Sequence, residues 1–270
     1  MNRVAAIQMT SGMDVSVNLC EAARLIGTAA RAGAKLVVLP ENFACMSKAD
    51  ADRLTIAEDD GRGPIQDFLA EQARTHKIWV AGGTIPIKSR DGARARAACV
   101  LHDDRGMRVT RYDKIHLFDV RLPNGERYHE SSATEPGEEL TVVDTPFGKL
   151  GLAVCYDLRF PELFRGLLDD GVEIVALPSA FTSHTGRAHW DLLVRARAVE
   201  NFVYMIAAAQ WGTHANGRQT HGDSMIVNPW GDVLDRLPQG VGYAIAEIDR
   251  NEQTQLRSNL PAIEHRRLGK

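Results

Sequence analysis

Residues 150–165 constrain the fold of this chain more than any other segment. Residues 150–154 form an apolar run of strand length, and Pro161 then opens a helical pattern because proline suits the first turn of a helix. Cys155 lies between them, at the carboxyl end of the predicted strand, where a rigid scaffold can present a side chain to a crevice. We therefore predict a buried strand, a nucleophilic cysteine, and an amphipathic helix whose apolar face carries Leu163, Phe164, Leu167 and Leu168.

The rest of the chain repeats this alternation of strand and helix. Apolar runs predict strands at residues 4–9, 36–39, 78–87, 97–102, 107–112, 174–177, 203–209, 224–227 and 243–248. Helical spacing predicts helices at residues 19–33, from residue 64, at 189–201 and at 251–259. The strand at 174–177 is expected to end at Pro178, and residues 115–139 and 211–222 are expected to be loops. This pattern predicts an α/β fold in a single domain that spans residues 1–270.

The composition excludes several classes of protein. The 270 residues are 44% hydrophobic and 25% charged with a formal net charge of −3, so no strong basic field is available to hold nucleic acid or an anionic membrane. The four cysteines lie at scattered positions, which favours a reducing compartment over a disulfide framework. No segment approaches the roughly 20 apolar residues of a membrane helix, and the first residues carry too short an apolar run for a signal peptide. We expect a cytoplasmic protein.

Three ionisable residues each follow a predicted strand: Glu41, Lys114 and Cys155. If these strands lie side by side, their ends meet at one edge of the sheet. Each residue alone also has a structural interpretation, because such a cysteine is most often a small core residue and such a lysine an edge or surface charge. Together they form a chemically sensible set of nucleophile, cation and carboxylate.

That set can hydrolyse an amide or a nitrile. Glu41 can take the proton of the Cys155 thiol, and Lys114 can stabilise the anion. The charge that develops on the attacked carbonyl oxygen can be met by Lys114 and by the backbone N–H of Tyr156. Protonated Glu41 can then donate to the leaving ammonia or amine, and afterwards activate the water that hydrolyses the thioester.

Three ordered motifs carry a family resemblance: Leu39-Pro-Glu41-Asn, Tyr112-Asp-Lys114-Ile-His-Leu-Phe-Asp and Cys155-Tyr-Asp-Leu-Arg-Phe-Pro-Glu-Leu. The chain resembles the nitrilase superfamily of carbon–nitrogen hydrolases, whose hallmark is a Glu-Lys-Cys triad. The resemblance implies that Glu41 is the general base, Lys114 the transition-state cation and Cys155 the nucleophile. It implies that Glu130, after the lysine motif, holds and orients Lys114. It also implies a four-layer α-β-β-α sandwich, homodimers or higher homo-oligomers that extend it to eight layers, and catalysis without a cofactor.

Within the superfamily the chain is most similar to the Nit branch, and there to the deaminated glutathione amidases. The segments that carry this similarity are residues 178–190, 195–201, 207–210, 228–231 and 265–267. The sister ω-amidases, which act on 2-oxoglutaramate, lack the Ala-Ala-Ala-Gln run that ends at Gln210. One departure is Asp223, since relatives usually have Gly-His-Ser where this chain has Gly-Asp-Ser.

Both groups act on a terminal amide of a small acidic molecule, so the resemblance implies ammonia release from an amide substrate that carries a carboxylate. Such a substrate needs a cationic contact, and Arg159, four residues after the nucleophile, is the first candidate. An ion pair between Arg159 and Glu162 is an equally good interpretation. Tyr156, Phe181 and Thr182 are further candidates for substrate contacts.

Other readings of the sequence stay open. Within the enzyme class, an N-carbamoyl amino acid hydrolase and a true nitrilase would share the same nucleophile. A thiol hydrolase could instead pair Cys155 with His116 or His189, and a catalytically idle scaffold could use the same fold. The nine histidines lack zinc-site spacing, so we predict no metal site. The charged tail, residues 260–270, is a candidate for a subunit interface.

Overall fold

Two β-sheets form the centre of the molecule. The computed structural model describes residues 2–268 except 49, 91 and 124. The first sheet has the order β17-β1-β2-β3-β5-β4, with β6 paired to β5. Its strands are β1 (Arg3–Gln8), β2 (Leu36–Val38), β3 (Trp79–Ala81), β4 (Ile85–Lys88), β5 (Ala95–His102), β6 (Arg108–Asp113) and β17 (Gly242–Glu247). The second sheet has the order β16-β15-β12-β11-β10-β9. Its strands are β9 (Val142–Thr145), β10 (Gly148–Leu152), β11 (Ile174–Ser179), β12 (Tyr204–Ala209), β15 (Ser224–Val227) and β16 (Val233–Leu237).

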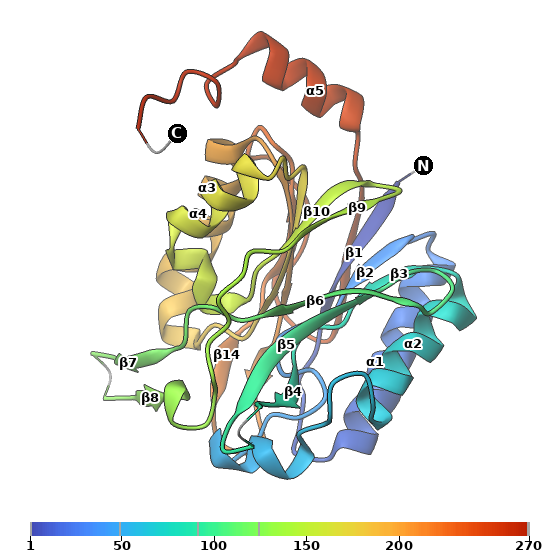
Figure 1. The fold of residues 1–270 in the computed structure, drawn as a ribbon, viewed down its shortest axis with the longest axis vertical. Helices are drawn as coiled ribbons and strands as arrows, with labels where there is room; N and C mark the ends of the chain where they lie inside the picture. The colour runs from blue at the N-terminus through green and yellow to red at the C-terminus, as the bar shows by residue number, and fades with distance from the viewer. Residues whose placement is uncertain (1, 49, 91, 124, 269–270) are drawn as a thin grey trace.

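Helices cover the outer face of each sheet. Helices α1 (Val15–Arg31) and α2 (Pro64–His76) lie on the first sheet, and α3 (Pro161–Asp169) and α4 (Ser183–Asn201) lie on the second (Figure 1). Helix α5 (Arg250–Asn259) lies beyond the ends of the strands, next to the C-terminal tail (Figure 1). The layers therefore run helix, sheet, sheet, helix, which confirms the predicted α-β-β-α sandwich.

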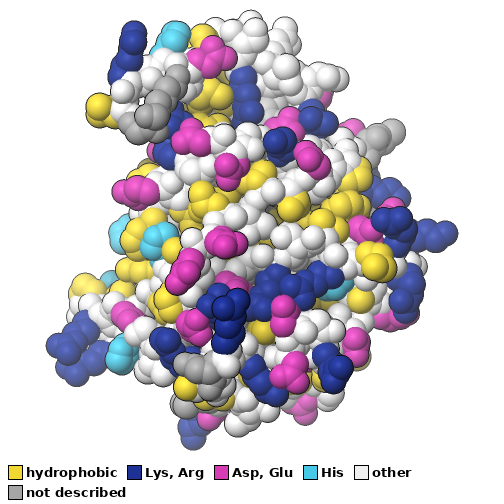
Figure 2. Space-filling model, viewed as in Figure 1, with side chains coloured by type: hydrophobic (Ala, Val, Ile, Leu, Met, Phe, Trp, Pro, Cys, Tyr) yellow, Lys and Arg dark blue, Asp and Glu magenta, His cyan; other side chains and the backbone are white. Residues whose placement is uncertain are grey.

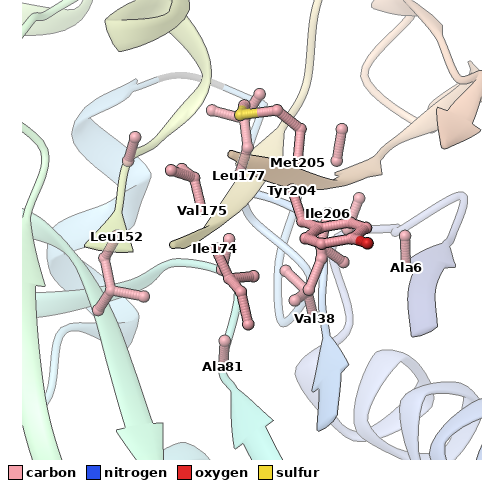
Figure 3. Packing of buried hydrophobic residues seen from close by; sticks show 14 of the residues in the cluster. Ala6, Val38, Ala81, Leu152, Ile174, Val175, Leu177, Tyr204, Met205 and Ile206 are labelled. Atoms are coloured by element: carbon pink, nitrogen blue, oxygen red, sulfur yellow. The ribbon is translucent and has the colours of Figure 1, made fainter. Parts of the chain in front are cut away.

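The side chains of β1 show how the sequence builds two cores. Val4 and Ala6 belong to the cluster between the two sheets, whereas Ala5 and Ile7 belong to the cluster under α1 and α2. This division follows the period of two along a strand, which sends neighbouring side chains to opposite faces. Figure 3 shows the inner cluster, in which Ala6, Val38 and Ala81 of the first sheet lie beside Leu152, Ile174, Tyr204 and Ile206 of the second.

The direction of the central strands decides which residues meet. Strands β1, β2 and β3 run parallel, and so do β10, β11 and β12. Parallel strands place their carboxyl ends at one edge of a sheet, where ligands bind in α/β folds. The segments after β2, β10 and β11 therefore lie at comparable ends of two packed sheets.

Two helices begin as the sequence indicates. Pro161 occupies the first turn of α3, and Leu163, Phe164, Leu167 and Leu168 are its buried side chains. Pro64 likewise opens α2, whose buried residues include Ile65 and Leu69. The apolar face expected for α3 is confirmed.

Helix α4 begins earlier than predicted. Its first residue is Ser183, not His189, so the expected loop before it is six residues shorter. Residues 182–186 are weak helix formers, which hid the first turn in the sequence. The Thr182 side chain caps that turn by accepting the Thr185 N–H, and Gly186 packs where a Cβ would collide with His221.

The predicted loops contain short hairpins. Strands β7 (Asp119–Arg121) and β8 (Arg127–His129) pair within residues 115–139, followed by the 3₁₀ helix η2 (Glu130–Ser132). Strands β13 (Trp211–Thr213) and β14 (Gln219–His221) pair within residues 211–222. These strands were missed because three-residue strands are too short to show a hydrophobic period.

Pro178 does not end its strand, because β11 continues to Ser179. The pairing of β11 with β10 stops at Ala176, whereas its pairing with β12 continues to the end. Proline is tolerated there because one side of the strand no longer has a ladder partner. Across the described ranges, none of the helices is long and apolar enough to cross a membrane.

Candidate active site

A pocket lies at the carboxyl ends of the central strands. Glu41 follows β2, Lys114 follows β6, and Ala180 follows β11. The 3₁₀ helix η3 (Cys155–Arg159) follows β10. All eight residues that the sequence singled out line this pocket, namely Glu41, Lys114, Glu130, Cys155, Tyr156, Arg159, Phe181 and Thr182.

The Lys114 ammonium joins the two carboxylates of the site. Its Nζ donates to Glu41 Oε1 at 2.8 Å and to Glu130 Oε2 at 2.8 Å. Glu130 also accepts the Phe118 N–H at 2.7 Å, and an Arg53 guanidinium N–H at 3.2 Å. These additional donors fix the Glu130 carboxylate, which in turn fixes the position of Lys114.

Burial makes this cluster electrostatically strong. The side chains of Lys114, Glu41 and Glu130 are 2%, 4% and 7% exposed. The two carboxylates raise the pKa of Lys114 although burial opposes this, so the ammonium stays charged. Lys114 and Arg53 lower the pKa of Glu130 to about 2 against the effect of burial, so this carboxylate stays ionised.

The turn after β10 presents the Cys155 side chain in a strained backbone conformation. Cys155 has a φ of 47°, in the left-handed region that residues other than glycine rarely adopt. The buried Asp157 carboxylate stabilises this turn by accepting the Val154 N–H at 2.8 Å and the Tyr112 hydroxyl at 2.7 Å. It also accepts the His116 N–H at 3.0 Å, so one carboxylate ties the cysteine turn to the segment that carries Lys114.

The surroundings of Cys155 differ from those of an ordinary buried thiol. Burial alone raises the pKa of Cys99 to about 12. Burial and the Glu41 carboxylate raise the pKa of Cys155, while Lys114 and a backbone hydrogen bond from Ala180 act in the opposite direction. Cys155 thus rests as a thiol beside a carboxylate that can take its proton and a cation that can stabilise its anion.

Arg159 lies against aromatic rings instead of a carboxylate. Its guanidinium carbon is 5.9 Å from the centre of the Tyr156 ring and 5.2 Å from that of Phe181, and an N–H meets His189 Nδ1 at 3.2 Å. Among the residues described, no ion pair joins Arg159 to Glu162, which is exposed on α3. The guanidinium is therefore available at the pocket wall.

The two histidines considered as bases lie elsewhere. His116 stacks on Phe160 with ring centroids 3.6 Å apart, and its Nδ1 lies 2.8 Å from Asp157 Oδ1. His189 is exposed and contacts Arg159. Neither histidine is one of the described residues that line the pocket, which favours Glu41 as the base near Cys155.

Several pocket residues were not found by sequence reasoning. They are Asn42, Arg53, Phe118, Tyr128, Ala180, Thr185 and Arg218. Arg53 comes from the 3₁₀ helix η1 (Asp50–Ile56) and Arg218 from the turn of the β13–β14 hairpin. Neither the short 3₁₀ helix nor the hairpin turn carries a periodic signal in the sequence. Tyr128 on β8 could have been found only by recognising its hairpin.

Asp223, where the chain departs from the resemblance, lies outside the pocket lining. Its buried carboxylate accepts two N–H groups of Arg236, and its carbonyl accepts the Trp190 indole N–H at 2.7 Å. The departure is therefore accommodated by an ion pair with β16. Within the described part of the chain, no group of three or more His, Cys, Asp or Glu residues could hold a metal ion.

The comparisons with known proteins define the class. The family model for carbon–nitrogen hydrolases matches residues 3–258, and this chain belongs to that family. It is thus a hydrolase of carbon–nitrogen bonds of the nitrilase superfamily, built as an α-β-β-α sandwich around an active-site cysteine.

Comparison with individual relatives shows which members of this family the chain is similar to. It is 43% identical over 98% of its length to a human protein named deaminated glutathione amidase, of which it covers 82%. It is 40% identical to the Synechocystis protein of that name, over 97% of both chains. The structure of Saccharomyces cerevisiae Nit3 matches with a TM-score of 0.88 at 32% identity, over 99% of this chain and 97% of that one. An amidase from Nesterenkonia sp. AN1, whose active-site cysteine carries an acrylamide adduct, matches with a TM-score of 0.79 at 25% identity, over 98% of this chain and 100% of that one.

Proposed function

We propose that this enzyme hydrolyses an amide of a small acidic metabolite through a thioester on Cys155, with deaminated glutathione as its substrate. The observation that carries the proposal is the buried Lys114 ammonium, held at 2.8 Å from both Glu41 and Glu130 in the pocket that Cys155 lines. Relatives at about 40% identity over nearly the whole chain bear the name of that activity.

The proposed reaction begins with proton transfer from Cys155 to Glu41. The sulfur then attacks the amide carbon, and Lys114 meets the negative charge that develops on the carbonyl oxygen. The backbone N–H of Tyr156 is the second proposed donor to that oxygen. Glu41 returns the proton to the leaving nitrogen, and the C–N bond breaks to leave the acyl group on the sulfur.

In the second half of the reaction, Glu41 takes a proton from water. The resulting hydroxide attacks the thioester, and the carboxylic acid product leaves while Cys155 regains its proton. Glu130 does not take part in these transfers. It accepts hydrogen bonds from Lys114 and Phe118, and we assign it the task of holding the ammonium in place.

The leaving group depends on the substrate. In deaminated glutathione the amide joins a 2-oxoglutaryl group to cysteinylglycine, so the product amine is the dipeptide. The expectation of ammonia release is therefore wrong for deaminated glutathione, because ammonia is released only from a primary amide such as 2-oxoglutaramate, the substrate of the alternative ω-amidase activity. An assay of the proposed function must therefore detect both amines.

We also propose a homodimer, located in the cytoplasm. Leu192 and Val199 of α4 and the neighbouring Trp230 are large apolar side chains that are exposed in the single chain, as expected of an interface. Arg266 binds Asp169 of α3 and holds part of the tail on the same helical layer, while residues 269–270 lie outside the described residues. Light scattering of the wild type and a Leu192→Glu variant tests the dimer, since the variant should be monomeric.

Turnover of a substrate panel tests the proposed activity. The panel holds deaminated glutathione, 2-oxoglutaramate, an N-carbamoyl amino acid and a simple nitrile, with ammonia and cysteinylglycine both measured. We expect the highest kcat/KM for deaminated glutathione and no turnover by Cys155→Ala. The matched control Cys20→Ala removes an exposed thiol and should behave as the wild type. Preference for 2-oxoglutaramate would reassign the substrate, and turnover that survives in Cys155→Ala would refute the mechanism.

A further inference from the structure

The charges that line the pocket do not balance. Two carboxylates, Glu41 and Glu130, face four cationic side chains. Lys114 and Arg53 form ion pairs with those carboxylates. Proton transfer from Cys155 to Glu41 moves charge within the pocket and leaves its sum unchanged. The pocket therefore keeps an excess of two positive charges, which come from the guanidinium groups of Arg159 and Arg218.

Arg218 is held rigidly without a carboxylate partner among the described residues. The Nη2 group of Arg218 donates to the Ala180 carbonyl at 3.1 Å, and the guanidinium carbon lies 5.0 Å from the centre of the Tyr128 ring. Its Nε is buried and has no hydrogen-bond acceptor in the described part of the chain. A buried donor without an acceptor is unfavourable, and an oxygen of a ligand in the pocket would satisfy this N–H.

The hairpin that carries Arg218 is anchored on both sides. Asn216 accepts the Arg218 N–H at 2.9 Å and donates to the Ser47 carbonyl at 2.7 Å. The His214 ring lies 2.9 Å from the Ser11 carbonyl and 2.7 Å from the Thr220 hydroxyl. The guanidinium is therefore positioned before a ligand arrives, which reduces the entropy lost on binding.

The two guanidinium groups without a carboxylate partner come from different elements of the fold, and both lie beside the segment of Ala180 and Phe181. Arg159 lies on the same 3₁₀ helix as Cys155, so it is close to any acyl group bound to that sulfur. Arg218 comes from a separate hairpin and lies beside Tyr128 of β8. A guanidinium binds a carboxylate through two parallel hydrogen bonds, so each of these groups suits one carboxylate.

We propose that Arg218 binds a carboxylate of the leaving group while Arg159 binds a carboxylate of the acyl group. The pocket would then select amides that carry one negative charge on each side of the bond that breaks. This inference rests on the proposed function and deepens it. Deaminated glutathione has this distribution of charge, with one carboxylate on the 2-oxoglutaryl group and one on the terminal glycine, whereas 2-oxoglutaramate has only the first.

Steady-state kinetics with both substrates test the assignment. Arg218→Gln should lower kcat/KM for deaminated glutathione about 30- to 100-fold, mainly through KM, because a charge-assisted contact is lost. The ratio of kcat/KM for deaminated glutathione to that for 2-oxoglutaramate should fall by a similar factor. Arg159→Gln should instead lower kcat/KM for both substrates. The control Arg187→Gln changes an exposed arginine of α4 and should leave both values unchanged. A ratio that is unchanged in Arg218→Gln would overturn the inference.

Binding to an inactive protein separates this inference from the proposed function. Calorimetry on Cys155→Ala measures the affinity for deaminated glutathione and for its derivative in which the glycine carboxylate is a neutral amide. The derivative should bind about 30- to 100-fold more weakly, and this difference should disappear in Cys155→Ala/Arg218→Gln. A difference that persists in the double variant, or no binding of deaminated glutathione, would contradict the role of Arg218. Failure of turnover alone would contradict only the proposed function.

Discussion

Charged side chains lie on both faces of the segment formed by the end of β6 and Lys114. Those on the outer face belong to a surface network, and the one on the inner face belongs to the pocket. Arg111 and Asp113 point outward, where Arg111 contacts Asp113 at 2.7 Å and Asp60 at 3.2 Å. Tyr112 and Lys114 point inward, and Lys114 contacts the two pocket carboxylates at 2.8 Å. The exposed fraction is 14% for the Arg111 side chain, 51% for that of Asp60, and 2% for that of Lys114.

This difference shows that burial, and not the number of ion pairs, separates a reactive cluster from a surface network. Figure 2 shows basic and acidic side chains intermixed over the face on which β5 and β6 lie, where Asp60 is half exposed and its ion pairs are open to screening by water. The inner cluster is shielded, so its charges shift one another's pKa values and control the thiol.

The largest difference between a substitution at an inner position and one at an outer position should be in catalytic activity. Lys114→Met removes the proposed oxyanion cation and should lower kcat/KM by at least about 1,000-fold. Asp113→Asn changes the adjacent residue on the outer face and should leave kcat/KM within about twofold of the wild type. Kinetics with deaminated glutathione measure both. Comparable losses in the two variants would show that the inner cluster has no special role.

The next largest difference between inner and outer substitutions should be in the free energy of unfolding. Lys114→Met leaves the carboxylates of Glu41 and Glu130 buried without their shared cation, and should lower the free energy of unfolding by about 3–5 kcal/mol at neutral pH. Arg111→Met removes a partly exposed cation and should cost at most about 1 kcal/mol.

The pH dependence gives this test a second readout. Without Lys114, burial should raise the pKa of Glu130 in the folded state, so the variant should lose stability relative to the wild type as pH rises above about 4.5. Urea unfolding at several pH values measures this slope. A variant whose stability relative to the wild type does not change with pH would argue against the buried carboxylate pair.

Much of this comparison could be predicted from the sequence. Glu41 and Cys155 follow strongly apolar strands and Lys114 follows a more polar one, so the sequence placed these three correctly at strand ends, whereas Glu130 was indicated only by the family resemblance. The partners of these residues could not be predicted in the same way. Arg53 lies in an irregular segment far from Glu130 in the chain, and only the tertiary fold brings the two to 3.2 Å.

Other features depended on contacts that no local pattern reveals. The first turn of α4 forms from weak helix formers because Thr182 caps it and Gly186 fits against His221. Arg218 reaches the pocket because a three-residue strand on each side forms a hairpin. The periodicity of hydrophobic residues predicts long buried helices and strands well, but it does not predict short polar ones.

Inner and outer substitutions should also differ in their effect on stability at acid pH. The folded-state pKa of Glu130 lies near 2, below the ordinary value of 4.5, so its ionisation stabilises the fold above about pH 4.5. That contribution is lost as pH falls from about 4.5 to 2. Glu130→Gln should therefore flatten the loss of stability in this range, whereas Asp60→Asn on the exposed network should alter it less. Parallel acid-unfolding curves for the wild type and Glu130→Gln would contradict the assignment.

The smallest effect should be on the titration of the thiol. Glu41→Gln removes a negative charge that raises the pKa of Cys155, so that pKa should fall. Turnover should nevertheless be lost, because the variant lacks the base. Alkylation rate against pH measures the pKa, and an exposed thiol, Cys20, serves as the internal reference. A Cys155 pKa that rises in Glu41→Gln would contradict the described electrostatics.

The most direct test of the central claim is to trap the acyl-enzyme. The wild type is mixed with deaminated glutathione, quenched in acid during turnover, digested and analysed by mass spectrometry. We predict that the peptide containing Cys155 gains the mass of a 2-oxoglutaryl group, that peptides containing Cys20 or Cys99 do not, and that Cys155→Ala shows no adduct. Steady turnover with Cys155 unmodified, or with the acyl group on another residue, would contradict the account.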